Sequence, residues 1–209
     1  MSRNHLSADG QQTPPLSGNA LDDPRMLEIC RSLRVRLWIR LARIVLIAAA
    51  AGLLIALDFG PVKFVPVLVW ILCLVMLQVV IANFRWLRRI ERVLRAYQWE
   101  RRPGVRRLDV NERRPRSPHV VKISHGSGRW SPEMVMSPVI RHRTWEEDMA
   151  SAIWFAGDER FGGVVAIPGG EAPMFTKPRQ WEQLESRRAK ADADALDRAQ
   201  RAGIDGKKW

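Results

Sequence analysis

The sequence predicts a membrane α-hairpin, made of two transmembrane helices with juxtamembrane extensions, plus a small cytosolic mostly-β domain and a C-terminal helix. Three observations lead to this fold class. Two apolar stretches, residues 37–57 and 64–84, are each 21 residues long and lie six residues apart. Arginines crowd the outer side of both stretches. Short β-type runs separated by turn residues then fill residues 104–178, and a charged helical pattern follows them.

The length and the flanks of the two apolar stretches predict that both cross a bilayer. A 21-residue helix spans roughly 31 Å, which is about the hydrocarbon thickness of a membrane. The connection at residues 58–63 contains the helix-breaking pair Gly60-Pro61. Because cytoplasmic flanks collect Lys and Arg, we expect a multi-pass protein of the plasma membrane with both termini in the cytoplasm. The 43 residues ahead of the uninterrupted apolar core are too many for a cleaved signal peptide.

Shifts in composition divide the chain into four parts. The first is polar and rich in Ser, Gly, Gln and Pro, which indicates disorder. In the second we expect one helix over residues 24–58 and another that ends at Pro103-Gly104. In the fourth we expect a helix over residues 180–202 that ends at Gly203. The parts are a disordered N-terminal tail (1–21), the transmembrane hairpin with juxtamembrane helices (22–103), the cytosolic mostly-β domain (104–178) and the charged C-terminal helix and tail (179–209).

Small residues recur in the first apolar stretch at Ala48, Gly52 and Ala56. Such a face lets two helix backbones approach closely in lipid. We expect it to pack against the second stretch of the same chain, because the short connection keeps the two together; a seam between two copies is the alternative. The second stretch has no charged residue or histidine in its interior, which disfavours a channel or transporter component.

The β-type runs predict a compact β-barrel or β-roll, SH3-like or OB-like. Side chains alternate across a strand, so we expect Ile153 and Phe155 to point inward and Trp154 outward. The expected runs are 105–110, 119–124, 134–136, 153–156, 163–167 and 174–176, with one short helix that begins at Thr144. The aromatic residues expected to fill the core are Trp130, Trp145, Trp154, Phe155, Phe161 and Phe175.

The segment at residues 153–169 predicts the tightest β-hairpin of the domain. Gly157 and Gly162 supply positive φ angles, and Asp158 and Arg160 pair across the turn. The simplest interpretation is a structural hairpin. The alternative is a recognition edge, whose candidate residues are Trp154, Asp158, Arg160 and Phe161.

Positive charge is concentrated beside the second apolar stretch. Residues 84–143 hold sixteen basic and five acidic residues, while the whole chain carries a net charge of +12. We expect this block to bind the anionic headgroups of the lipid bilayer rather than nucleic acid, because the membrane is the nearer polyanion. The headgroup-binding candidates are Arg85, Arg88, Arg89, Arg92, Arg95, Arg101 and Arg102.

Signatures of catalysis and metal binding are missing from the sequence. It contains no phosphate-binding loop, nucleophile elbow or zinc-protease motif. We therefore assign no catalytic, cofactor-binding or metal-binding residue. His119, His125 and His142 would have to converge from separate runs to bind a metal. Cys30 and Cys73 lie at different predicted depths, which excludes a disulfide between them.

One segment carries a family resemblance. Ile153-Trp154-Phe155-Ala156-Gly157-Asp158, followed by Arg160-Phe161-Gly162-Gly163 and Pro168-Gly169, resembles a segment of uncharacterised actinobacterial integral membrane proteins. Those proteins share the order of two membrane spans and a small cytosolic domain. The resemblance implies the same architecture and brings no catalytic residue with it.

These observations favour a non-enzymatic interaction or scaffold module, held at the inner leaflet and facing a protein partner or a second copy of the chain. The alternative is a membrane-anchored enzyme or regulatory subunit with a cleft in residues 104–178. A deep pocket with clustered titratable groups would favour the enzyme, whereas a flat apolar patch would favour the module.

Overall fold

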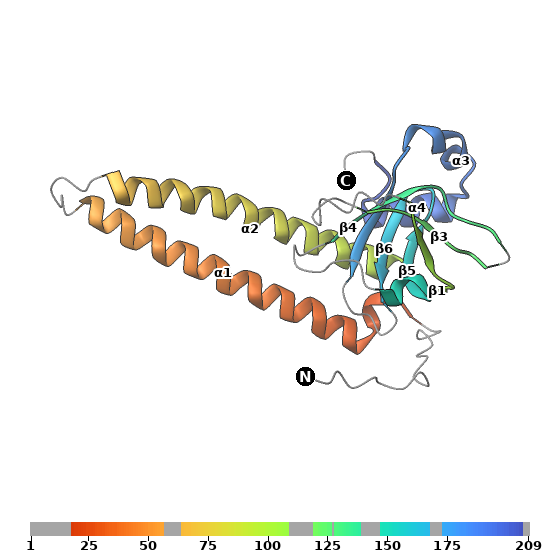
Figure 1. Ribbon diagram of the computed structural model, residues 1–209, viewed down its shortest axis with the longest axis horizontal. Coiled ribbons are helices and arrows are strands. Elements are labelled where there is room, and N and C mark those ends of the chain that lie inside the picture. Colours follow the sequence, from red (N-terminus) through yellow and green to blue (C-terminus); the bar gives the residue numbers. More distant parts are fainter. Residues whose placement is uncertain are drawn as a thin grey trace. The chain divides into compact units, whose positions relative to one another are not determined.

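The computed structural model describes residues 18–56, 64–108, 119–126, 128–138, 147–167 and 173–206. The chain forms two compact units: Glu28–Arg88, and residues 18–27 together with the described residues from Arg89 onward. The elements are η1 (Ala20–Asp22), α1 (Pro24–Ala56), α2 (Phe64–Ala96), β1 (Glu100–Arg102), β2 (Val105–Arg107), β3 (His119–Ile123), β4 (Met134–Pro138), η3 (Glu147–Ala150), β5 (Ile153–Asp158), β6 (Gly162–Ala166), β7 (Met174–Pro178), η4 (Glu182–Leu184), α3 (Glu185–Ala189) and α4 (Ala193–Ala202) (Figure 1).

The two apolar stretches form long helices, as predicted. Both α1 and α2 are 33 residues long, and by length and composition each can cross a membrane. Their apolar side chains are mostly exposed, which is the pattern of a surface that faces lipid rather than water. Residues 57–63, where the predicted loop lies, are outside the described residues.

A regular seam of buried residues runs along each helix of the hairpin. Leu37 and Ala51 are buried on α1, and Cys73, Val80 and Leu87 on α2, at multiples of seven residues. A seven-residue repeat is the spacing that keeps one face of a helix against an antiparallel neighbour. The rings of Trp38 and Phe84 meet edge to face, with centroids 5.5 Å apart.

The predicted stripe of small residues does not form this seam. Ala51 is buried, whereas Ala48 is half-buried and Ala56 is exposed. A Cβ atom at Gly52 would have no heavy atom within 4 Å, so no backbone approaches it closely. The prediction that Ala48, Gly52 and Ala56 pack against the second helix is therefore wrong. The seam follows the seven-residue repeat of larger side chains.

Helix α2 ends earlier than predicted. It stops at Ala96, and Glu100–Arg102 forms strand β1, so the helix does not reach Pro103. The cause is a contact with the N-terminal segment: Ala20 N–H donates to Tyr97 O at 2.9 Å, and Trp99 Nε1–H donates to Ala20 O at 3.0 Å. Ala20 and Leu21 are buried in a short turn, which corrects the predicted disorder of residues 1–21 at these positions.

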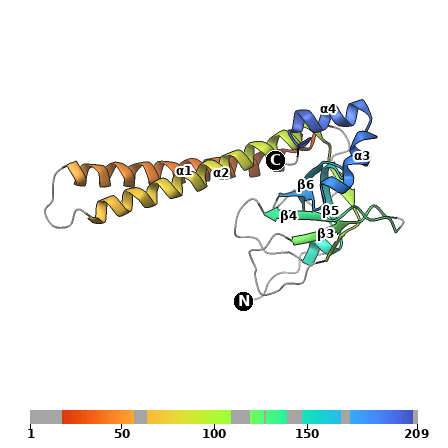
Figure 2. The same cartoon turned by 90° about the horizontal axis from the view of Figure 1, so that it is seen from above.

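The β domain is a nearly closed antiparallel sheet of seven strands in the order β1-β5-β6-β7-β4-β3-β2 (Figure 2). The predicted compact, mostly-β domain is confirmed, in the form of a nearly closed sheet. Strands β1 and β2 are the two ends of the sheet, yet only Pro103-Gly104 separates them along the chain. A Cβ atom at Gly104 would collide with Ala150 O, and Gly104 O accepts from Ser124 N–H at 3.0 Å. This short link brings the two sheet ends together.

Apolar side chains fill the inner face of the sheet. Methionine is prominent there, and its flexible thioether suits the uneven space inside a small barrel. Phe155 is 1% exposed and lies in this core, as predicted. Trp130 does not join it, because its side chain is 46% exposed. The core residues are Val105, Val121, Ile123, Met134, Met136, Met149, Ile153, Phe155, Val165, Ile167 and Met174.

The outer face of β5 is buried as well. Trp154 faces away from Phe155, as predicted, but it is only 2% exposed. Its ring packs on Trp99, with centroids 5.9 Å apart. The expectation that Trp154 lies on a solvent-exposed face is therefore wrong, because Trp99 and the segment around it cover that face.

The C-terminal region holds two short helices rather than one continuous helix. The break falls at Lys190–Asp192, and Asp192 then caps α4 by accepting Ala195 N–H at 2.7 Å. Gly203 ends α4 in the left-handed conformation, as predicted, with φ 67°. Ile204 N–H donates to Ala199 O at 2.9 Å, which completes a Schellman motif. The predicted helix start at Thr144 lies outside the described residues.

Candidate functional site

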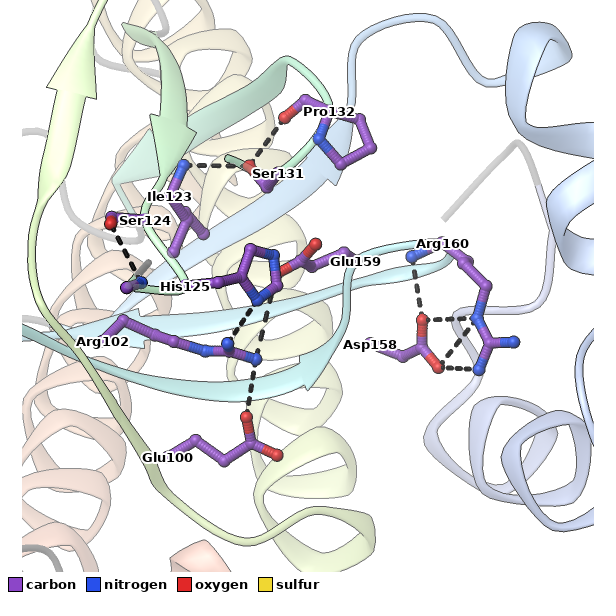
Figure 3. Close-up of polar contacts among 11 residues, drawn as sticks. Glu100, Arg102, Ile123, Ser124, His125, Ser131, Pro132, Asp158, Glu159 and Arg160 are labelled. Carbon is purple, nitrogen blue, oxygen red and sulfur yellow. Dashed lines mark hydrogen bonds and ion pairs between the residues drawn. The ribbon is translucent and has the colours of Figure 1, made fainter. Parts of the chain in front are cut away.

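The β5–β6 hairpin has the polar turn that the sequence predicts. Asp158 pairs with Gly162 in the register, and Phe161 N–H donates to Asp158 O at 2.9 Å. The Asp158 carboxylate accepts the Arg160 backbone N–H at 2.9 Å and its Nη2–H at 2.6 Å (Figure 3). These hydrogen bonds raise the pKa of Arg160, so the guanidinium stays charged. The predicted pair is confirmed.

Glycine is required where the two strands of this hairpin approach each other. Gly157 and Gly162 have positive φ angles of 155° and 116°, as predicted. A Cβ atom at Gly163 would collide with Ala156 O and lie 3.0 Å from Cε2 of Phe155. The hairpin is therefore closed by backbone packing as well as by the ion pair.

The four candidate residues do not form one surface. Asp158 and Arg160 are half-exposed, but Phe161 is 1% exposed and Trp154 is covered by Trp99. The recognition edge expected from all four is therefore wrong, because the two large apolar side chains are part of the packed interior. The structure supports the simpler interpretation of a tight structural hairpin.

A second polar cluster lies next to this turn and joins three separate parts of the sheet. Glu100 and Arg102 lie two residues apart on β1, His125 follows β3, and Glu159 follows β5 (Figure 3). Arg102 Nη2 lies 2.6 Å from Glu100 Oε2 and 3.8 Å from Glu159 Oε1. Arg102 Nη1 lies 2.5 Å from His125 Nδ1, and His125 Nε2 forms an ion pair with Glu159.

Burial sets the electrostatics of this cluster. The side chains of Arg102, His125 and Glu159 are 18%, 23% and 16% exposed. Burial raises the pKa of Glu159 above its usual range, while the neighbouring His125 and Arg102 oppose that rise. The imidazole, the guanidinium and the carboxylate face one another. Their polar atoms contact each other rather than an open site where a substrate could bind. We interpret the cluster as a clasp across the gap between β1 and the end of β3.

The headgroup-binding candidates divide into two groups. Arg85, Arg88, Arg92 and Arg95 recur three or four residues apart on α2, and all four are exposed. Arg101 on β1 is also exposed. Arg89 is half-buried and Arg102 belongs to the clasp, so these two are less accessible to a headgroup.

Arg92 has an additional intramolecular neighbour. Its Nη1 atom would lie 2.7 Å from a Cβ atom placed on Gly203. A cation at the end of α4 is favourable, because the last carbonyl groups of a helix carry partial negative charge. Arg92 therefore stabilises the docked C-terminal helix in addition to any contact with lipid.

The part of the chain that the structure describes contains no assembled metal or redox site. No group of three or more His, Cys, Asp or Glu residues there could hold a metal ion. His119 lies on β3 and His125 in the clasp, while His142 is outside the described residues. Both cysteines are free and buried.

The clasp could not be found from the sequence, because Arg102, His125 and Glu159 lie far apart along the chain and come together only in the folded sheet. The one local signal was the position of Glu159 in the predicted turn. Comparisons of the chain with protein-family models, curated proteins and solved structures gave no significant match. The resemblance of residues 153–169 to actinobacterial membrane proteins stays a prediction.

Proposed function

We propose that this chain is an integral membrane protein whose helical hairpin anchors the β-barrel at the inner leaflet of the plasma membrane as a non-enzymatic interaction module. The observation that carries the proposal is the surface of the hairpin. Apolar side chains along α1 and α2 are exposed over the length of a bilayer. In water such a surface would aggregate, whereas in lipid it is solvated.

The arginines on α2 support the proposed orientation. Arg85 and Arg88 follow directly after the apolar stretch of α2, and Arg95 follows about two turns after Arg88. Positive residues at the end of a span retain that end in the cytoplasm. Anionic headgroups there add about 1 kcal/mol for each Lys or Arg near the surface.

The packed barrel supports a role in binding rather than catalysis. Its inner face is occupied by the side chains of the apolar core, including Met134, Met136 and Phe155. The polar cluster beside it is engaged in its own ion pairs. The outer surface is therefore the part of the barrel that a partner would contact.

Topology reporters on the full chain test the anchor. A fluorescent reporter ahead of residue 18, or after residue 206, should fluoresce in the cytosol, and alkaline phosphatase placed in the 58–63 connection should be active outside. The chain should also remain in the membrane pellet after alkaline carbonate extraction. Release by carbonate, or phosphatase activity at either terminus, would contradict the proposal.

Charge variants test the orientation. Arg85→Glu, Arg88→Glu and Arg95→Glu together should weaken cytoplasmic retention of the second flank and raise phosphatase activity after residue 206. Arg92 is left unchanged because it packs at Gly203. The matched control is Lys177→Glu, Arg187→Glu and Lys190→Glu, which reverses three exposed charges elsewhere. An equal effect of both sets would contradict the assignment to the flank.

A further inference from the structure

A basic and aromatic surface lies on the barrel itself, apart from the arginines of α2. Strand register places its residues on one face. Arg106 on β2 is directly opposite Lys122 on β3, and an isolated bridge pairs Ser124 with Trp130. Opposed residues of an antiparallel pair share a face, and so do residues two apart on one strand. Arg106, Lys122, Ser124 and Trp130 therefore point the same way.

This shared face is the outer one. Ile123 lies between Lys122 and Ser124 and points into the core. Arg106 is exposed, Lys122 is half-buried and Trp130 is 46% exposed. Arg129, next to Trp130, is exposed as well. We call Arg106, Lys122 and Trp130 the barrel patch, with the exposed Arg129 beside it.

The barrel patch places two like charges, Arg106 and Lys122, directly opposite each other. Cations directly across an antiparallel pair repel each other and weaken the strand pairing. Among the residues that the structure describes, neither Arg106 nor Lys122 forms an ion pair, although Glu133 nearby is paired with Arg179. The patch thus carries a charge arrangement that favours an external anion.

Hydrogen bonds fix the backbone next to Trp130. Met134 pairs with Val121 while Trp130 pairs with Ser124, so one extra residue is accommodated between them as a bulge. Pro132 has no N–H for the ladder, and the Ser131 hydroxyl accepts the Ile123 N–H at 2.9 Å and donates to Pro132 O at 2.8 Å (Figure 3). The backbone that carries the exposed indole of Trp130 is therefore held in place.

We propose that the barrel patch docks on the anionic headgroup layer of a bilayer, with Trp130 at the headgroup level and Arg106, Lys122 and Arg129 against lipid phosphates. An exposed tryptophan beside cations suits this layer, because its ring is apolar at one end and its N–H is polar. The chain enters β1 soon after α2 ends, so a hairpin in the membrane keeps the patch at high local concentration near the surface. The inference rests on the proposed membrane anchor and adds a second contact.

Fluorine NMR of the full chain in nanodiscs tests the patch. The chain is labelled with fluorotryptophan, and the Trp130 resonance is assigned by its loss in Trp130→Phe. In discs that contain phosphatidylglycerol, a lipid with a spin label near its headgroup should broaden this resonance. In discs of phosphatidylcholine alone, a soluble paramagnetic chelate should broaden it instead.

Charge reversal supplies the matched comparison. Each basic residue near an anionic surface changes occupancy about fivefold, so Arg106→Glu with Lys122→Glu should lower it at least about twenty-five-fold. The Trp130 resonance of this variant should respond to the chelate in both discs. Arg187→Glu with Lys190→Glu should behave like the unchanged chain. Unmoved Trp99 and Trp154 resonances show that a variant is folded, and Arg106→Gln with Lys122→Gln replaces a variant that is not.

The outcomes separate the patch from the anchor. A chain that does not co-elute with nanodiscs contradicts the anchor, and the patch is then tested on the same chain with added phosphatidylglycerol vesicles. Equal lipid broadening in both disc types, or none in either, overturns the patch. Broadening by spin-labelled duplex DNA without broadening by anionic lipid also overturns it and assigns the surface to nucleic acid.

Discussion

The Nδ1 atom of His125 lies 2.5 Å from Nη1 of Arg102, although the two residues lie 23 positions apart in the sequence. The other ring nitrogen, Nε2, faces the carboxylate of Glu159. The imidazole is thereby oriented at both of its nitrogens. It lies between Arg102 on β1 and Glu159, which follows β5.

Breaking this clasp should cost more than breaking an ion pair on the surface. Arg102→Met removes the guanidinium from beside the half-buried carboxylate of Glu159, and we expect a loss of roughly 2 kcal/mol or more in unfolding free energy. Arg179→Met removes an exposed pair with Glu133 and should cost no more than about 0.5 kcal/mol. Thermal melts of the full chain in detergent compare the two. Equal losses would mean that the clasp is only a surface pair.

Two tryptophans should respond oppositely to truncation. Trp154→Ala removes a side chain that is 2% exposed and packed on Trp99, and large aromatic-to-Ala changes in a core cost about 3–5 kcal/mol. Trp130→Ala removes a side chain that is 46% exposed and should cost less than about 1 kcal/mol. Denaturant melts followed by near-ultraviolet circular dichroism measure both. A stable Trp154→Ala variant would contradict the buried outer face of β5.

A single methyl group should distinguish two glycines. At Gly163 a Cβ atom would lie 2.8 Å from Gly157 Cα, which is backbone and cannot rotate away, so Gly163→Ala should cost roughly 2 kcal/mol or more. At Gly206 a Cβ atom meets nothing within 4 Å, and Gly206→Ala should be neutral within about 0.5 kcal/mol. Melting temperatures of the two variants give the answer. A tolerated alanine at residue 163 would show that the strands lie further apart than described.

Alkaline titration should report on the only tyrosine of the chain, Tyr97. Burial, with a smaller contribution from Asp158, raises its pKa from 10.0 to about 12. The folded state thus holds the phenol proton more tightly than the unfolded state. The buried phenol of Tyr97 therefore makes its full contribution to the free energy of unfolding below pH 10. This contribution is lost as the pH rises from 10 toward 12.

Phenolate absorbance after rapid pH jumps measures this titration. The midpoint should lie near 12 in the folded chain and near 10 in denaturant. Tyr97→Phe keeps the ring and removes the phenolate signal. Between pH 10 and pH 12 this variant should unfold less readily than the unchanged chain. A midpoint near 10 in the folded chain would mean that the hydroxyl group is exposed to water.

Local patterns predicted the parts of the fold that depend on neighbouring residues. Apolar length placed α1 and α2, and the spacing of Gly157, Asp158 and Gly162 predicted the β5–β6 turn with its ion pair. The end of α2 could not be predicted, because residues beyond Ala96 continue a helical pattern. Contacts between Tyr97, Trp99 and the distant Ala20 end the helix instead.

The exposure of two tryptophans in the candidate site and the core was predicted wrongly for the same reason. Trp154 alternates with Phe155 as predicted, but the sequence gives no sign that Trp99 covers the outer face. Trp130 was assigned to the core on size alone, whereas the bulge at Ser131 turns it outward with Ser124. Burial of a side chain depends on which element covers it, and that is decided by pairings between distant parts of the chain.

The link at Pro103-Gly104 has a consequence for synthesis on the ribosome. Strand β1 emerges first, yet its partner β5 begins at Ile153, which is made roughly three to ten seconds later at about 5–20 residues per second. During that interval β1 has no neighbour in the sheet, while β2, β3 and β4 can already pair in succession. Strand β7, which joins β6 to β4, is made later still, and a nascent chain paused before Ile153 exposes an unpaired strand edge to chaperones or to aggregation.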